Sequence, residues 1–198
     1  MESTRLPGKP LKLIGNKTLI QRVYEQALQS KAKKVLVATD SEEIISHCSN
    51  NSIDTVLTRR GHLTGSDRLA EAVNILDLEE DQIVVNVQGD EPFLDPQMLD
   101  NFLIEFHSRA SDCEVGTLAC PIISTEEYFD PNTVKVVLRH DHRALYFSRS
   151  AIPHDREKLQ NFKHCYRHLG VYLYNREILL NFSRLPISNL EGIEKLEQ

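Results

Sequence analysis

The apolar positions of the chain alternate between helical and strand spacing. Between residues 17 and 31, Leu19, Ile20, Val23 and Ala27 recur at intervals of three and four, which predicts a helix with one buried face. Short β-branched runs predict strands between such segments. In the first half of the sequence we expect helices at 17–31, 41–51, 68–78 and 95–110, and strands at 35–39, 55–58 and 82–87.

This alternation of strand and helix with short connections predicts an α/β fold of Rossmann-like type. We expect a mostly parallel sheet with helices on both faces. The rhythm changes at residues 114–175, where four strand-like runs follow one another with few helices between them. We interpret this part as a continuation of the sheet with an antiparallel excursion, a candidate dimerisation arm. Without a repeat or a linker, residues 1–198 are predicted to form a single domain.

Both ends of the sequence lack elements that such a domain normally has. A parallel α/β domain usually begins on a strand, whereas this chain begins on a loop. At the other end, Leu190, Ile193 and Leu196 stop inside an amphipathic pattern without a glycine stop. The sequence therefore predicts a longer natural chain, with a first strand before Met1 and a further segment after Gln198.

Composition excludes several classes of protein. The chain of 198 residues is 40% hydrophobic and 26% charged, as in a folded globule, and its net charge of −6 gives no basic footprint for duplex nucleic acid. We find no apolar run of the roughly 20 residues that span a bilayer, and no signal-peptide pattern. We therefore expect no membrane partner. The four scattered cysteines have no zinc-ligand spacing, which favours reduced thiols in a cytoplasmic protein.

The run VVNVQGDEP places polar residues where a predicted buried strand ends. Ligands of open α/β sheets gather at the carboxyl ends of strands, and Gln88, Asp90 and Glu91 fall there, with Gly89 allowing close approach of the backbone. A carboxylate such as Asp90 suits Mg²⁺, which completes its shell with water and phosphate oxygens. An ordinary Gly-Asp turn explains the motif equally well.

Two other stretches carry candidate anion-binding groups. The opening STRLPGKP supplies Ser3, Arg5 and Lys9 on a loop stiffened by prolines, although a solvated basic tail is the simpler interpretation of that loop alone. In TRRGHLTGSDRLAE, Gly65 and Ser66 precede a predicted helix capped by Asp67, with Arg59 and Arg68 on either side; an ordinary capped helix accounts for this stretch too. All three stretches belong at one edge of a parallel sheet, which favours a phosphate, metal and nucleobase site.

These motifs closely resemble those of the 3-deoxy-manno-octulosonate (Kdo) cytidylyltransferases over essentially the whole chain. The resemblance rests on STRLPGKPL, VATD, HLTGSDRLAE, VNVQGDEP, FDPNTVKVVL, ALYFSRSAIPHDR, RHLGVYLY and LEGIEKLEQ. QGDEP and RLPGKPL are partly shared with CMP-sialate synthetases, whereas ALYFSR followed by RHLGVYLY is more particular to the Kdo group. A second magnesium-binding Asp of that family would lie after Gln198.

The resemblance implies Mg²⁺-dependent transfer of CMP from CTP to the anomeric hydroxyl of Kdo, by a cytoplasmic homodimer that serves lipopolysaccharide synthesis. It implies catalytic roles for Arg5, Lys9 and Asp90, with Asp90 as the metal ligand. The residues implied for CTP binding are Ser3, Arg5, Lys9, Thr39, Arg59, Ser66 and Gln88, and those implied for Kdo binding are Arg149, His168, Tyr172 and Glu197.

Other interpretations stay open at this point. A CMP-sialate synthetase-like enzyme would share the opening loop and Asp90, and a non-catalytic nucleotide-binding module would need no second metal ligand. Arg149 is equally explained by a structural salt bridge, and His168 and Tyr172 by a core pair on one face of a strand. We interpret His140 and His142 as part of a solvated turn.

Overall fold

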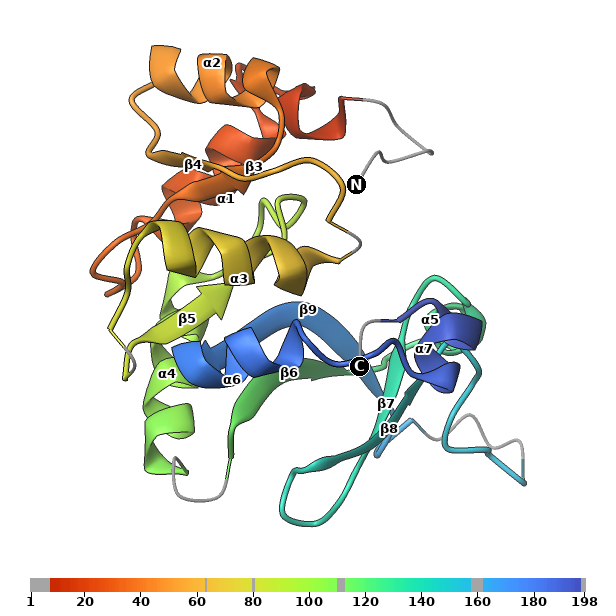
Figure 1. The fold of residues 1–198 in the computed structure, drawn as a ribbon. Coiled ribbons are helices and arrows are strands. Elements are labelled where there is room, and N and C mark those ends of the chain that lie inside the picture. Colours follow the sequence, from red (N-terminus) through yellow and green to blue (C-terminus); the bar gives the residue numbers. More distant parts are fainter. Residues whose placement is uncertain (1–7, 63, 80, 110–112, 158–161, 197–198) are drawn as a thin grey trace. The chain divides into compact units, whose positions relative to one another are not determined.

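The structure is a computed structural model that describes residues 8–62, 64–79, 81–109, 113–157 and 162–196 (Figure 1). Contacts within the chain divide it into two units. Unit 1 combines the chain up to Gly116 with Tyr172–Leu185, and unit 2 combines Thr117–Val171 with the segment from Pro186 onward. The prediction of one domain over residues 1–198 stays a prediction.

Four helices of unit 1 begin at a residue whose side chain caps them. The hydroxyl or carboxylate of the capping residue accepts a backbone N–H of the first turn in α1, α2, α3 and α4, and these residues are Thr18, Ser41, Thr64 and Asp95. The elements of unit 1 in chain order are a 3₁₀ turn η1 (Lys9–Leu11), β1 (Leu13–Ile14), β2 (Lys17–Thr18), α1 (Leu19–Ala27), β3 (Val37–Thr39), α2 (Glu42–Asn50), β4 (Thr55–Leu57), α3 (Gly65–Ile75), β5 (Ile83–Asn86), α4 (Pro96–Ser108) and α6 (Arg176–Phe182).

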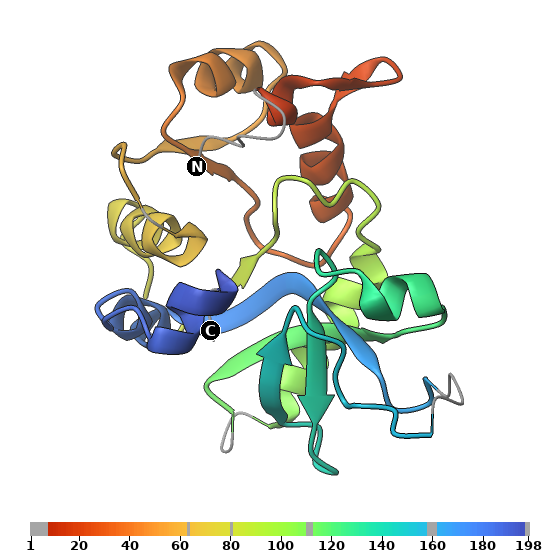
Figure 2. The same ribbon diagram turned by 90° about the vertical axis from the view of Figure 1, so that its right-hand side faces the viewer.

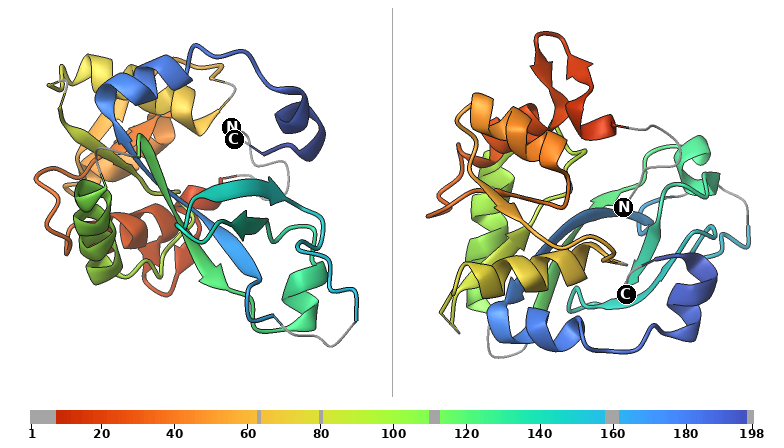
Figure 3. Two further views of the ribbon diagram at one scale, coloured as in Figure 1. Left: turned by 90° about the horizontal axis from the view of Figure 1, so that it is seen from below. Right: turned by 45° about the horizontal axis from the view of Figure 1, so that its top comes forward.

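Unit 1 takes one of its strands from late in the sequence. β1 and β2 form a short antiparallel hairpin, which is red in the right-hand view of Figure 3, and β3 and β4 pair in parallel. β5 pairs antiparallel with the end of β9 (Tyr166–Asn175), so that Ile83 faces Asn175. The following helix α6 then packs on α3, where Val73 and the fully buried Leu179 join Tyr174 in one apolar cluster. This cluster anchors α3, the helix that follows the loop containing Arg59, between β4 and α3.

Unit 2 is built on antiparallel strands. β7 (Lys135–Leu138) and β8 (Ala144–Ser148) form the hairpin seen in Figure 2, and the first residues of β9 pair with β7. A second apolar cluster joins Ile122, Tyr128 and Cys165. The remaining elements are β6 (Val115–Pro121), which begins in unit 1 and pairs with β9, α5 (Thr125–Phe129) and α7 (Asn189–Glu194).

The α/β class is confirmed, but the described strand pairs are not mostly parallel. Among the pairs whose register is determined, β3–β4 is parallel, whereas β1–β2, β5–β9, β7–β8 and β7–β9 are antiparallel. The physical reason is that β5 finds its partner almost ninety residues later, at Tyr172–Asn175, and a local pattern cannot specify such a distant neighbour. Within the described residues, no helix is long and apolar enough to cross a membrane.

Candidate active site

The opening loop and the end of β5 meet in unit 1. The Lys9 Nζ atom lies 2.5 Å from Asp90 Oδ2, although the two residues are 81 positions apart in the sequence. Their side chains are 38% and 46% exposed, so the pair remains accessible to solvent and to a ligand. The structure therefore brings together a cation and a carboxylate that the sequence placed at one edge of the fold.

Local backbone geometry positions both members of this pair. Gly8 has a φ of +65°, a left-handed conformation that glycine adopts without strain, and the η1 turn with Pro10 follows directly. On the other side, Glu91 N–H donates to the Gln88 carbonyl at 3.2 Å and closes the turn that carries Asp90. A Cβ atom at Gly89 would lie 3.4 Å from Ile20 Cδ1, so this turn rests directly on α1.

Three of the candidate residues fall in undescribed parts of the chain, and a fourth precedes Asp90. Ser3, Arg5 and Glu197 lie outside the described residues, and their roles stay predictions. Gln88 is partly buried in the turn before Asp90.

Arg68 joins the ends of the two parallel strands. Its guanidinium donates to Thr58 Oγ1 at 2.7 Å, just after β4, and to Asp40 Oδ2 at 2.9 Å, just after β3. Burial alone would raise the pKa of Asp40, but the hydrogen bond and charge of Arg68 hold that pKa below its usual value. Thr39 is buried, and its hydroxyl accepts the Ser41 N–H at 3.2 Å. Its predicted role in CTP binding therefore stays a prediction.

Helix α3 begins earlier than the sequence predicted. Thr64, and not Asp67, is the N-cap; Asp67 completes a capping box by accepting the Thr64 N–H. Ser66 thus lies inside the first turn of α3, where it is almost fully buried and its hydroxyl is 3.4 Å from that of Tyr174. By contrast, the Arg59 side chain is 77% exposed.

Arg149 in unit 2 is held by backbone carbonyls. Its guanidinium donates to the carbonyl oxygens of Glu194 at 2.7 Å, Pro131 at 3.0 Å and Lys195 at 3.3 Å. The Glu194 carboxylate in turn accepts the Arg149 N–H and the Ser148 hydroxyl, and these bonds lower its pKa. In this structure Arg149 therefore fastens α7 to the end of β8, and the predicted contact with a sugar carboxylate would share the same guanidinium.

Lys135 is a buried cation that sequence reasoning missed. It has no exposed surface, and its Nζ donates to the carbonyls of Asp130 at 2.8 Å, Thr133 at 2.6 Å and Arg149 at 2.6 Å. Burial lowers the pKa of Lys135. The sequence pattern that could have revealed it is KVVL, a lysine at the start of an apolar run. A buried cation at such a position needs hydrogen-bond acceptors around its ammonium group.

His168 and Tyr172 lie on β9 as predicted. The Nε2 atom of His168 is 2.9 Å from Thr117 Oγ1, and its ring meets that of Phe147 edge to face at 5.0 Å. Burial lowers the pKa of His168 to about 4, so the ring is neutral at pH 7. Tyr172 stacks on Tyr174 with ring centroids 5.8 Å apart. A neutral imidazole can bond to sugar hydroxyls, but it adds no charge to help a carboxylate bind.

The buried imidazole predicts a pH-dependent stability. The unfolded chain binds a proton at His168 below about pH 6.5, whereas the native ring resists protonation until about pH 4, so stability is lost as the pH falls through this window. Relative to His168→Gln, the wild type should lose up to about 3 kcal/mol of unfolding free energy between pH 7 and pH 4. Denaturant unfolding at a series of pH values measures this difference, and parallel profiles for the two proteins would contradict it.

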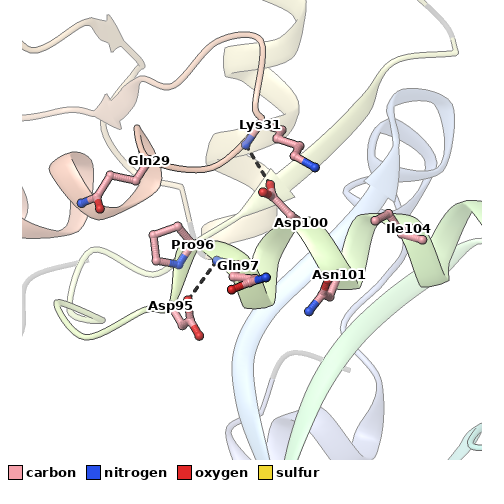
Figure 4. A pocket seen from close by; sticks show the side chains of 8 residues that line it. All are labelled: Gln29, Lys31, Asp95, Pro96, Gln97, Asp100, Asn101 and Ile104. Atoms are coloured by element: carbon pink, nitrogen blue, oxygen red, sulfur yellow. Dashed lines mark hydrogen bonds between the residues drawn. The ribbon is translucent and has the colours of Figure 1, made fainter.

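One open pocket lies elsewhere in unit 1. It has a volume of about 340 Å³ and is lined by residues at the end of α1 and the start of α4 (Figure 4). Its carboxylates are already engaged: Asp95 caps α4, and Asp100 accepts the Lys31 N–H at 2.8 Å. None of the residues predicted for the active site lines this pocket.

Asp90 fits magnesium by its chemistry. Its carboxylate is half-exposed, with Oδ2 in contact with Lys9, and magnesium usually takes one or two protein carboxylates together with substrate phosphates and water. Within the described residues, no cluster of three or more His, Cys, Asp and Glu could hold a metal ion by itself. The arrangement thus fits an ion that arrives with a phosphate ligand rather than one caged by protein.

Fold and site together define an α/β protein that presents a lysine–carboxylate pair at the end of a strand. The family model for cytidylyltransferases matches residues 1–198. Two relatives named 3-deoxy-manno-octulosonate cytidylyltransferase come from Methylococcus capsulatus and Thermodesulfovibrio yellowstonii. The first is 45% identical and covers 99% of this chain and 79% of its own length; the second is 46% identical and covers 99% and 80%. The chain therefore belongs to the cytidylyltransferase family, in its 3-deoxy-manno-octulosonate group.

Solved structures agree with this placement. The structure of CMP:2-keto-3-deoxy-manno-octonic acid synthetase complexed with CTP is 41% identical, with a TM-score of 0.89, and the match covers 99% of this chain and 79% of that one. A cytidylyltransferase from Leptospira borgpetersenii is 17% identical with a TM-score of 0.60, covering 98% of this chain and 67% of that one. The second likeness concerns the fold alone.

Proposed function

We propose that the chain transfers CMP from CTP to the anomeric hydroxyl of Kdo and releases pyrophosphate. The observation that carries this proposal is the contact between Lys9 and Asp90, in which a cation suited to phosphate lies beside a carboxylate suited to Mg²⁺. The names of the relatives and of the CTP-bound neighbour support the choice of both substrates.

Lys9 would hold phosphate oxygens of CTP and stabilise the charge that develops on departing pyrophosphate. Arg5 and Ser3 are proposed for the same loop. Asp90 would bind Mg²⁺, which neutralises phosphate charge when it is present. The exposure of both side chains supports these roles, because a triphosphate can reach them without a change of the core.

The remaining residues are proposed for recognition of the two substrates. On the nucleotide side these are Thr39, Arg59, Ser66 and Gln88, of which Arg59 has the most exposed side chain. On the sugar side they are Arg149, His168, Tyr172 and Glu197. The proposal also includes a Rossmann-like arrangement of the sheet, a homodimer and a role in the cytoplasm in lipopolysaccharide synthesis.

Pyrophosphate release tests this function directly. The full-length protein with CTP, Kdo and Mg²⁺ should release pyrophosphate continuously, and omission of either Kdo or Mg²⁺ should stop the release. N-acetylneuraminate serves as the competing sugar acid, and it should neither support turnover nor inhibit at equal concentration. Absence of pyrophosphate with Kdo would reject the enzyme, and preference for N-acetylneuraminate would assign it to the sialate pathway.

A further inference from the structure

The loop at residues 59–62 is held through one side chain of α3. Arg59 N–H donates to Glu71 Oε1 at 2.9 Å, and the Arg59 Nε atom lies 3.6 Å from Glu71 Oε2. The His62 Nε2 atom also contacts Glu71 Oε2, and the His62 side chain is only 3% exposed. A single carboxylate thus contacts both ends of the loop.

Backbone contacts do not replace this attachment. In the described part of the chain, no backbone–backbone hydrogen bond joins residues 59–62 to another segment, although Thr58 N–H donates to the Thr39 carbonyl just before them. Gly61 adopts a φ of +90°, and a Cβ atom there would meet nothing within 4 Å. Within the described residues, the Glu71 carboxylate is thus the acceptor that attaches this loop to α3.

The carboxylate itself is well suited to this task. Burial alone would raise the pKa of Glu71, but the Arg59 N–H, His62 and the Arg59 charge hold that pKa below its usual value, so Glu71 is ionised at neutral pH. It sits on α3, whose position is fixed by the cluster of Val73 and Leu179. A helix anchored in an apolar cluster thus carries the acceptor for the loop at residues 59–62.

We propose that Glu71 is a positioning residue for nucleotide binding, which fixes the loop at residues 59–62 and thereby the place of the Arg59 guanidinium. Glu71 acts through Arg59, whose side chain is more exposed than that of Glu71. This inference rests on the proposed function, because that function places Arg59 on the CTP side of the site.

Steady-state kinetics and calorimetric titration with CTP test the role. Glu71→Ala should raise the dissociation constant and the KM for CTP roughly tenfold, because it removes hydrogen bonds to a charged group. The kcat value and the KM for Kdo should stay within about threefold, since the substitution acts on binding of one substrate only. Glu71→Gln should recover part of the affinity, because its amide oxygen still accepts the Arg59 N–H. Glu105→Ala, which removes an exposed carboxylate paired with Arg109 on α4, should change none of these values.

A double-mutant cycle separates positioning from a purely structural role. If Glu71 acts through Arg59, then Arg59→Ala with Glu71→Ala should bind CTP no more weakly than Arg59→Ala alone. A lower melting temperature with unchanged CTP affinity, or additive losses in the double mutant, would overturn the inference. Turnover by the wild type is measured first, so a failed proposed function is recognised independently of these variants.

Discussion

Replacement of Asp90 by asparagine is expected to reduce CMP transfer by on the order of 10²–10³-fold, the range seen when one group that stabilises transition-state charge is removed. Asparagine keeps the shape of the side chain but lacks the negative charge that attracts a divalent ion. Asp90 lies half-exposed in a turn, so the unfolding midpoint should stay close to that of the wild type.

The measurement is pyrophosphate release across a range of Mg²⁺ concentrations, together with thermal unfolding. Glu25→Gln is the matched control, because Glu25 forms a comparable pair with Lys17 at 2.7 Å in the same unit. The control should keep wild-type turnover. An Asp90→Asn enzyme with normal turnover and normal Mg²⁺ dependence would remove Asp90 from the mechanism.

Lys9→Ala is expected to lower turnover by on the order of 10²-fold, since it removes a cation that stabilises charge on the departing pyrophosphate. Stability should change little, because an exposed ion pair such as Lys9–Asp90 is worth about 0–1 kcal/mol. Lys9→Arg keeps the charge on a differently shaped group and should retain more activity than alanine does.

Lys17→Ala provides the control for this second prediction. It removes a lysine of similar exposure from a different ion pair of the same unit, the one with Glu25. Its turnover should match that of the wild type. A loss of less than threefold in Lys9→Ala would show that Lys9 does not contact the phosphates.

The elements that could be predicted from the sequence are those whose signals are local. Thr18, Ser41 and Asp95 cap α1, α2 and α4 close to the predicted helix starts. The start of α3 was misplaced because Thr64 and Asp67 both carry capping side chains, and either could serve as N-cap before the structure showed a reciprocal pair.

Strand partners and buried polar contacts depended on the tertiary structure. The apolar residues of β5 predict a buried strand, but they do not predict that its neighbour in the sheet is Tyr172–Asn175. Lys135 looked like one of many lysines, and only the folded chain shows its ammonium group surrounded by three carbonyl oxygens.

The sequence by itself determined the α/β class, the positions of most helices and the candidate residues Lys9 and Asp90, because helical periodicity, caps and short motifs act over a few residues. The tertiary structure decided that Lys9 reaches Asp90 and that Glu71 holds the Arg59 loop. Such contacts join residues between 12 and 81 positions apart, and they form only when packing of the helices and strands brings those segments together.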